Sequence, residues 1–236
     1  MSLPGSLQII AAEWNKSAEE LMRHFGAIEG TRKFLKSILH DEWLGNRTAI
    51  VSSFGIEAAV PLALVAEAKA STPVILIDTG YLFGVTRQYR DQLQQHLGLT
   101  DVRTSQPLPT QAASFNPEAN PPTCCETVKK EMLADALKDF SVWISGRKRY
   151  QGDMRSCIPV AEVSEGKIKV NPLALWSEEQ VKGFMNELNL PRHPLAARGF
   201  ESVGCFPCTR PGKGRSGRTF AHGGTECGLH IDGSGI

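Results

Sequence analysis

The chain of 236 residues lacks the features that mark several broad classes of protein. Its formal net charge is only +1, so any anion site must be a local cluster of cations and not the chain as a whole. Residues 1–14 have neither a basic start nor a long apolar run, and no later segment reaches the apolar length of a membrane span. We therefore expect a cytoplasmic protein that binds neither nucleic acid nor a membrane.

Six cysteines are too few for a disulfide scaffold in a chain of this length, so reduced thiols that serve a metal or catalysis are expected. Four of them form two close pairs in distant parts of the chain, Cys124-Cys125 and Cys205-x-x-Cys208. Such thiolates can bind a 4Fe–4S cluster or zinc, whereas the expected compartment disfavours two disulfides. Adjacent cysteines make a poor zinc knuckle because neighbouring side chains diverge, which favours the cluster.

The remaining two cysteines have different surroundings. Cys227 lies in E-C-G-L-H, in a glycine-rich stretch with cations nearby. A thiolate beside cationic groups has a lowered pKa and becomes a nucleophile, so Cys227 is the candidate catalytic residue. Cys157 lies in an apolar strand context and is expected to be a buried small side chain. His193 has no partner at metal-binding spacing and is expected to be structural.

The fold class follows from the alternation of apolar runs and helical patterns, without internal repeats. Continuous apolar or β-branched runs predict strands at residues 48–51, 73–77, 101–104 and 142–144. Helix formers predict helices at residues 57–68, 86–97 and 124–137. A hairpin is expected from 158–163 and 167–170, a capped helix at 177–188, and two short helices in the first forty residues. This order is typical of a doubly wound α/β fold with a mainly parallel sheet.

Polar segments follow three of the predicted strands. The small-residue loop S-S-F-G at 52–55 has the plan of a phosphate cradle, but an ordinary βα turn has the same plan. It matches neither G-x-x-x-x-G-K-[ST] nor G-x-G-x-x-G. Residues 78–80 (D-T-G) lie where open α/β sheets bind ligands. Four of the ten residues from 146 to 155 are cationic, and their position beyond a buried strand favours an anionic substrate over a solvated loop.

Taken in order, the motifs resemble those of the assimilatory adenylyl-sulfate/phosphoadenylyl-sulfate reductase family, in its iron–sulfur branch. They are S-S-F-G-I-E, D-T-G-Y-L-F, C-C with Lys129 following, G-R-K-R-Y-Q-G-D-M-R, V-N-P-L, S-V-G-C-F-P-C-T-R and E-C-G-L-H. The resemblance implies an adenine nucleotide α-hydrolase-like domain with an iron–sulfur site at residues 46–210. Packed helices at 1–45 would precede it, and a mobile tail at 211–236 would carry the catalytic cysteine.

The resemblance also implies roles for particular residues. The substrate-binding residues would be Ser52, Ser53, Phe54, Gly55, Asp78, Thr79, Gly80, Lys129, Gly146, Arg149, Gln151, Arg155, Arg215, Arg218 and His230. The paired cysteines would hold a 4Fe–4S cluster, namely Cys124, Cys125, Cys205 and Cys208. Cys227 would attack the sulfur of adenylyl sulfate, displace AMP and carry an S-sulfocysteine. Thioredoxin or glutaredoxin would then release sulfite, as in assimilatory sulfate reduction.

Several alternatives stay open at this point. S-S-F-G-I-E and D-T-G-Y-L-F resemble reductases that use the 3′-phosphorylated nucleotide, whose extra charge the cations at 147–149 could meet, whereas the cysteine pairs resemble those that use adenylyl sulfate. A PP-loop ATP pyrophosphatase or thiolase would need S-G-G-x-D-S, which is absent. A non-catalytic metal-binding regulator would leave Cys227 without a purpose. The chain departs from the usual family pattern at Gly84, Val128 and Tyr150, and a homo-oligomer is left open.

Overall fold

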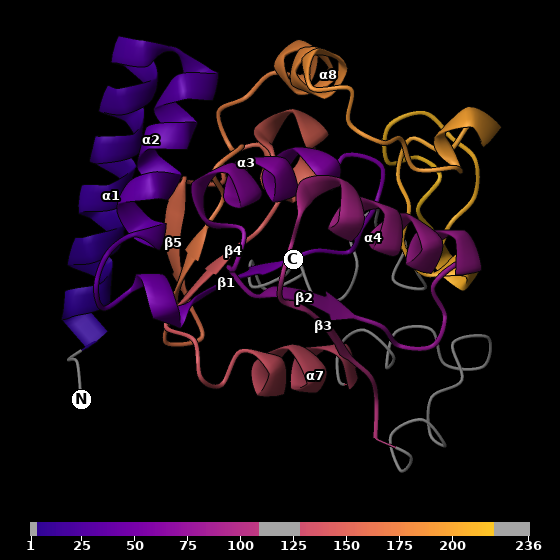
Figure 1. Cartoon of the computed structure of the whole chain (residues 1–236), viewed down its shortest axis with the longest axis horizontal. Coiled ribbons are helices and arrows are strands. Elements are labelled where there is room, and N and C mark those ends of the chain that lie inside the picture. Colours follow the sequence, from indigo (N-terminus) through magenta and orange to yellow (C-terminus); the bar gives the residue numbers. More distant parts are fainter. Residues whose placement is uncertain (1–3, 109–127, 220–236) are drawn as a thin grey trace.

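The computed structural model describes residues 4–108 and 128–219, and its centre is one sheet of six strands within those residues (Figure 1). The strand order is β3-β2-β1-β4-β6-β5. The strands are β1 (Thr48–Val51), β2 (Val74–Ile77), β3 (Val102–Ser105), β4 (Val142–Ile144), β5 (Ala161–Ser164) and β6 (Lys167–Val170). Adjacent strands are parallel except for the edge strand β5, which is antiparallel to β6. The predicted α/β fold with a mainly parallel sheet is confirmed.

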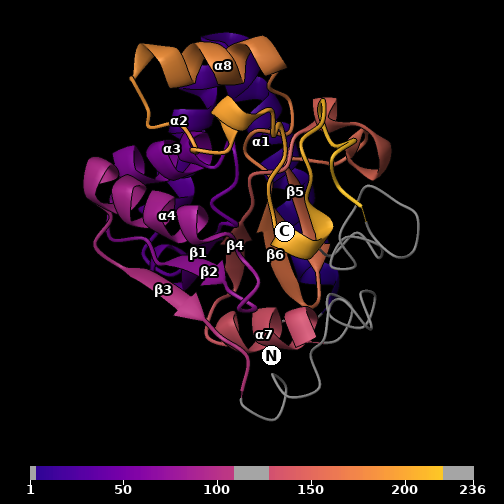
Figure 2. The ribbon, with the colours of Figure 1, turned by 90° about the vertical axis from the view of Figure 1, so that its right-hand side faces the viewer.

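Helices cover both faces of this sheet (Figures 1 and 2). The α-helices of the described residues are α1 (Pro4–Phe25), α2 (Ala27–Leu39), α3 (Ala59–Lys69), α4 (Gly84–Leu97), α7 (Lys129–Ala136) and α8 (Glu178–Glu187). Short 3-10 helices occur at Gly45–Arg47, Arg149–Gln151, Asp153–Arg155, Ala196–Arg198 and Phe206–Cys208. α3 and α4 lie on one face and α7 on the other, while the α1–α2 pair packs against α3 and β5.

The central strands β1, β2 and β4 contribute to two hydrophobic cores, one on each face of the sheet, because successive side chains point to opposite faces. Ile50 and Ile144 belong to the larger core cluster, which includes residues of α1 to α4 and α8. Val51, Ile75 and Trp143 belong to a smaller cluster under α7. Burial on both faces explains why these strands read as continuous apolar runs in the sequence.

The N-terminal helices differ from the prediction of two short helices. α1 has 22 residues, because between Gly5 and Gly26 the sequence contains neither proline nor glycine to stop it. Gly26 breaks the helical run with a φ of 79°, a conformation that favours glycine. No helix among the described residues has both the length and the apolar character to cross a membrane.

Local signals predicted the ends of two other helices correctly. Ser177 caps α8, and its hydroxyl accepts the N–H of Gln180 while the Gln180 side chain accepts the N–H of Ser177. Gly98 ends α4 in the left-handed conformation. The hairpin prediction was right in place, but β5 begins three residues later than expected, at Ala161.

This later start corrects the expectation for Cys157, which is exposed and lies in a surface turn. The buried run begins one residue further on, at Ile158, whose N–H binds the carbonyl of Arg155 at the end of the preceding 3-10 helix. His193 is structural, as expected. It is buried, its Nδ1 accepts the Leu195 N–H at 3.1 Å, and its Nε2 therefore donates to Thr86 Oγ1 at 3.0 Å. Burial lowers the pKa of His193 to about 4.

Candidate active site

A cavity lies where the direction of the strand order changes, between the carboxyl ends of β1 and β4. The chain leaves β1 toward β2 and β3 and returns to β4 on the other side, and such switch points are where open α/β sheets bind ligands. The residues that line the cavity are Val51, Ser52, Ser53, Gly55, Ile56, Glu57, Ala58, Pro61, Lys129, Gly146, Arg147, Lys148, Gln151, Arg155, Glu201, Ser202, Val203, Gly204, Arg215 and Arg218.

The S-S-F-G loop forms the floor of the cavity directly after β1. Ser52 Oγ accepts the N–H of Phe54 at 3.1 Å, which tightens the loop. Phe54 takes a positive φ of 49° and buries its ring in the larger core, so it lies outside the cavity lining. A Cβ on Gly55 would lie only 3.2 Å from the carbonyl oxygen of Val203. Ser52, Ser53 and Gly55 line the cavity as expected, and Phe54 anchors their loop.

Glu57, which follows this loop, binds the cationic segment after β4. Its carboxylate accepts hydrogen bonds from Lys148 Nζ at 2.9 Å, Tyr150 Oη at 2.6 Å and Gln151 Nε2 at 3.2 Å. Burial alone would raise the pKa of Glu57, but the charge of Lys148 and the three donors outweigh it and lower the pKa. The same burial lowers the pKa of Lys148, which Glu57 partly offsets. The two loops are thus joined by an ion pair inside the cavity.

Arg147 is held from the opposite side by the edge strand. Its Nη1 lies 3.1 Å from Glu162 Oε1, and that oxygen also accepts Asn171 Nδ2 at 3.0 Å and faces Lys169 Nζ at 3.6 Å. Lys169 is fully buried, with Nζ 4.7 Å from the centre of the Trp143 ring. Burial first and the Arg147 charge second lower the pKa of Lys169 to about 7, against the attraction of Glu162.

The C-terminal part of the described chain closes the cavity with arginines. Arg218 donates to Cys208 O and to Ser202 Oγ, each at 3.4 Å. A Cβ on Gly204 would overlap the Arg218 guanidinium at 2.4 Å, so the missing side chain makes room for it. Arg155 is buried and donates through Nη1 to Gln151 Oε1 at 2.5 Å. Lys129 and Arg215 add two more cations, which gives the cavity a local positive charge that the near-neutral chain lacks.

The D-T-G loop after β2 lies outside this lining. Asp78 is an ion-pair partner of Arg87, with Nε 2.7 Å from Oδ2 and Nη2 3.1 Å from Oδ1. Its Oδ1 also accepts the Gly80 N–H at 2.8 Å. Thr79 Oγ1 lies 3.6 Å from Cys205 Sγ. Among the contacts described, this loop faces Arg87 and the C-x-x-C segment, and a substrate role for it stays a prediction.

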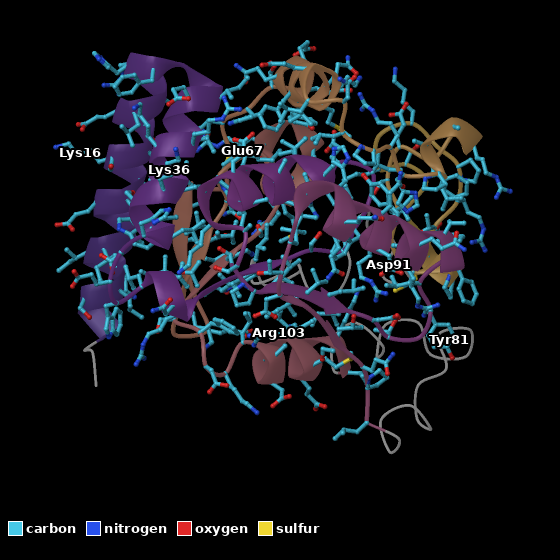
Figure 3. All side chains as sticks on the ribbon, viewed as in Figure 1. Lys16, Lys36, Glu67, Tyr81, Asp91 and Arg103 are labelled. Carbon is cyan, nitrogen blue, oxygen red and sulfur yellow. The ribbon has the colours of Figure 1, made fainter. Side chains whose placement is uncertain are left out.

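The C-x-x-C segment turns tightly beside that loop. Cys205 and Cys208 are both buried. Cys205 directly precedes the 3-10 helix Phe206–Cys208, and Cys208 is the last residue of that helix. The Phe206 N–H binds the carbonyl of Tyr81, which Figure 3 labels at the end of the molecule away from α1 and α2. Cys208 shares the smaller core cluster with Val128, at the start of α7. Among the described residues, no three His, Cys, Asp or Glu side chains are placed to hold a metal ion.

Four predicted site residues lie outside the described residues, namely Cys124, Cys125, Cys227 and His230. Arg149 is described but does not line the cavity, because its Nε donates to the carbonyl of Ile158 at 2.8 Å. The predicted site residues that do line it are Ser52, Ser53, Gly55, Lys129, Gly146, Gln151, Arg155, Arg215 and Arg218. Glu57 and residues 201–204 also line the cavity, and all of them except Glu201 lie in motifs that were visible in the sequence, S-S-F-G-I-E and S-V-G-C-F-P-C-T-R.

A mainly parallel α/β sheet with a cation-lined cavity at its switch point defines a class of proteins that bind anionic ligands such as nucleotides. The phosphoadenosine phosphosulfate reductase domain matches residues 47–211, which include β1, β4 and all of the cavity lining except Arg215 and Arg218. The chain belongs to this family.

The relatives include proteins named adenosine 5′-phosphosulfate reductase and proteins named phosphoadenosine 5′-phosphosulfate reductase. The chain is 38% identical to an adenosine 5′-phosphosulfate reductase of Mesorhizobium japonicum, over 91% of this chain and 86% of the relative. It is 37% identical to a phosphoadenosine 5′-phosphosulfate reductase of Aliivibrio fischeri, over 83% and 84%. The crystal structure of a phosphoadenylyl-sulfate reductase from Candida auris has the same fold, with a TM-score of 0.65 at 23% identity, over 89% of this chain and 99% of that one.

Proposed function

We propose that this protein reduces adenylyl sulfate to sulfite and AMP, with thioredoxin as the reductant. It is an oxidoreductase that acts on a sulfur group. The observation that carries the proposal is the cavity itself, where the S-S-F-G loop meets Lys129, Arg155, Arg215 and Arg218 in a chain of this family. Cations that converge on a loop at a switch point suit the adjacent phosphate and sulfate of the substrate.

In the proposed reaction, the Cys227 thiolate attacks the sulfur of the sulfate group. A bond forms between the two sulfur atoms, and the bond from sulfur to the phosphate oxygen breaks, so that AMP leaves with the electron pair. A thioredoxin thiolate then attacks Cys227 Sγ, and sulfite leaves with the pair of the broken S–S bond. The second thioredoxin thiol resolves the mixed disulfide, which regenerates the Cys227 thiolate. The cavity cations stabilise the charge that develops on the leaving phosphate.

We also propose that the two cysteine pairs hold a 4Fe–4S cluster. Cys205 and Cys208 fit this role because both are buried thiols on one tight turn. Val128 packs in the same cluster as Cys208 and follows Cys125 by three positions, so covalent geometry alone keeps Cys125 within roughly 11 Å of Val128. When bound, the cluster would join the two cysteine pairs and make this side of the cavity rigid.

The function is tested by following sulfite and AMP release from adenylyl sulfate with thioredoxin present. The wild-type protein should release both in equal amounts, and Cys227→Ser should release neither. The matched control is Cys157→Ser, because Cys157 is exposed and lies outside the cavity lining, and this variant should keep its activity. Turnover by Cys227→Ser would contradict the proposal. So would failure of the wild-type protein to release sulfite from both adenylyl sulfate and its 3′-phosphorylated form.

The cluster is tested by iron and acid-labile sulfide analysis of protein prepared without oxygen. Cys205→Ala and Cys208→Ala should lose iron, whereas Cys157→Ala should retain it, since four thiolates complete the site. The visible absorption of the wild-type protein gives a second readout that is independent of activity. Stoichiometric zinc in place of iron would overturn this assignment.

A further inference from the structure

All three adjacent cations of the segment after β4 are already bound by groups of the protein. Arg147 pairs with Glu162 at 3.1 Å, Lys148 pairs with Glu57 at 2.9 Å, and Arg149 donates to a backbone carbonyl. These residues, 147–149, are the cations that the sequence offers to a ribose 3′-phosphate. In the folded protein, carboxylates already pair with two of these cations, Arg147 and Lys148, before a substrate binds.

Of these pairs, the one between Glu57 and Lys148 lies in the cavity lining. The Lys148 side chain is 3% exposed and the Glu57 side chain is 21% exposed, so the carboxylate is the member that faces the open space. Tyr150 and Gln151 also donate to this carboxylate, which fixes its position. The cavity therefore presents the Glu57 carboxylate on one side, and the charged residues that line it elsewhere are Lys129, the arginines and Glu201.

We propose that Glu57 is a specificity-determining residue that selects adenylyl sulfate over its 3′-phosphorylated form. This inference rests on the proposed function and names the substrate that it prefers. A 3′-phosphate adds about two negative charges at neutral pH. Glu57 opposes those charges directly, and it occupies Lys148, the buried cation that would otherwise offset them. Discrimination arises from the unfavourable charge against the wrong substrate as well as from contacts to the right one.

Glu57→Gln is the direct test, because it removes the charge and keeps the shape and one oxygen acceptor. We expect the ratio of kcat/KM for the 3′-phosphorylated nucleotide to that for adenylyl sulfate to rise at least tenfold, about 1.4 kcal/mol. The added phosphate then supplies the counter-charge of Lys148 in place of Glu57. In Glu57→Gln/Lys148→Gln this gain should be lost, since the released cation is absent.

Tyr150→Phe is the matched control, because it removes one hydrogen bond to Glu57 but no charge. Its substrate ratio should stay within about threefold of the wild-type ratio. If the ratio in Tyr150→Phe changed as much as in Glu57→Gln, the cause would be a general loosening of the cavity, and the charge argument would be overturned. An unchanged ratio in folded Glu57→Gln would overturn the proposal outright.

Binding of the nucleotides without sulfate separates this proposal from the proposed function. The Kd values of AMP and adenosine 3′,5′-bisphosphate need no turnover, so they can be measured even if no sulfite is released. Glu57→Gln should shift their ratio at least tenfold toward the bisphosphate. Lys148→Gln, which leaves Glu57 without its counter-ion, should shift it toward AMP and serves if Glu57→Gln does not fold. An unchanged ratio in either variant contradicts the proposal.

Discussion

The loops after β1 and β2 follow neighbouring parallel strands, yet they have different surroundings. Residues 52–55 open onto the cavity, whereas residues 78–80 are bound by Arg87, by their own backbone and by the C-x-x-C segment. Both loops lie at the carboxyl edge of the sheet, so position at that edge does not by itself place a loop in the cavity lining. The difference is that β1, and not β2, borders the point where the strand order changes direction.

The cations near the two loops differ in the same way. Arg155 lines the cavity beside the first loop and donates to the neutral side chain of Gln151. The charge of Arg87 is met by the buried carboxylate of Asp78. The cavity beside the first loop is thus lined by more cations than carboxylates, whereas Arg87 and Asp78 form a one-to-one ion pair beside the second loop. Substitutions should separate these two roles.

The largest expected effect is that of Arg155→Ala. Loss of a preorganised cation in the cavity should lower kcat/KM for adenylyl sulfate by roughly 100-fold. Arg155→Lys should recover only part of this loss, because an ammonium group lacks the planar fork of donors. The matched control is Arg87→Ala, which removes the cation of the second loop and should change kcat/KM by less than about threefold. Equal losses in both alanine variants would contradict the distinction between the loops.

Asp78→Ala should affect stability more than catalysis. Its carboxylate accepts one backbone and two guanidinium hydrogen bonds in a buried position, so its loss should lower the free energy of unfolding by roughly 2 kcal/mol. Urea unfolding measures this change.

Ser53→Ala is the counterpart in the first loop. Ser53 is exposed, so this substitution should change stability by less than about 0.5 kcal/mol while it raises KM. The reverse pattern would contradict the account.

A smaller effect is expected in the pH dependence of stability. Burial would raise the pKa of Asp78, but hydrogen bonds from Arg87 and Gly80 outweigh it, so the folded-state pKa lies below the unfolded value of 3.8. The unfolded state then binds more protons in acid, and stability falls as pH falls. The stability that Asp78 contributes should be complete above about pH 5 and disappear as pH falls through its folded pKa. The wild-type protein and Asp78→Asn should thus converge in acid, and a constant difference between them would exclude this linkage.

Local patterns predicted the strands and most helices because the signals for them lie within each segment. β1 at 48–51 and β4 at 142–144 agree with their apolar runs, and the Ser177 capping box was visible in the sequence. The surroundings of the D-T-G loop were not visible in the same way. Which strand borders the switch point depends on the strand order, and that order is set by packing between distant segments.

Contacts between site residues that are far apart in the sequence also could not be predicted from local sequence patterns. Lys148 and Glu57 are 91 positions apart, so the sequence revealed a basic run but not the carboxylate that neutralises part of it. Cys157 was expected to be buried because apolar residues follow it, yet the 3-10 helix before it leaves it in a surface turn. The cysteine pairs and Cys227 were singled out by spacing and composition, and their chemistry stays a proposal.

The most direct test of the central claim is mass spectrometry of the wild-type protein after incubation with adenylyl sulfate in the absence of thioredoxin. The account predicts one sulfonate adduct, on the peptide that contains Cys227, with release of AMP in equal amount. Addition of reduced thioredoxin should remove the adduct and release sulfite. AMP release without any adduct, or an adduct on another cysteine that thioredoxin discharges, would contradict the claim that Cys227 carries the reaction.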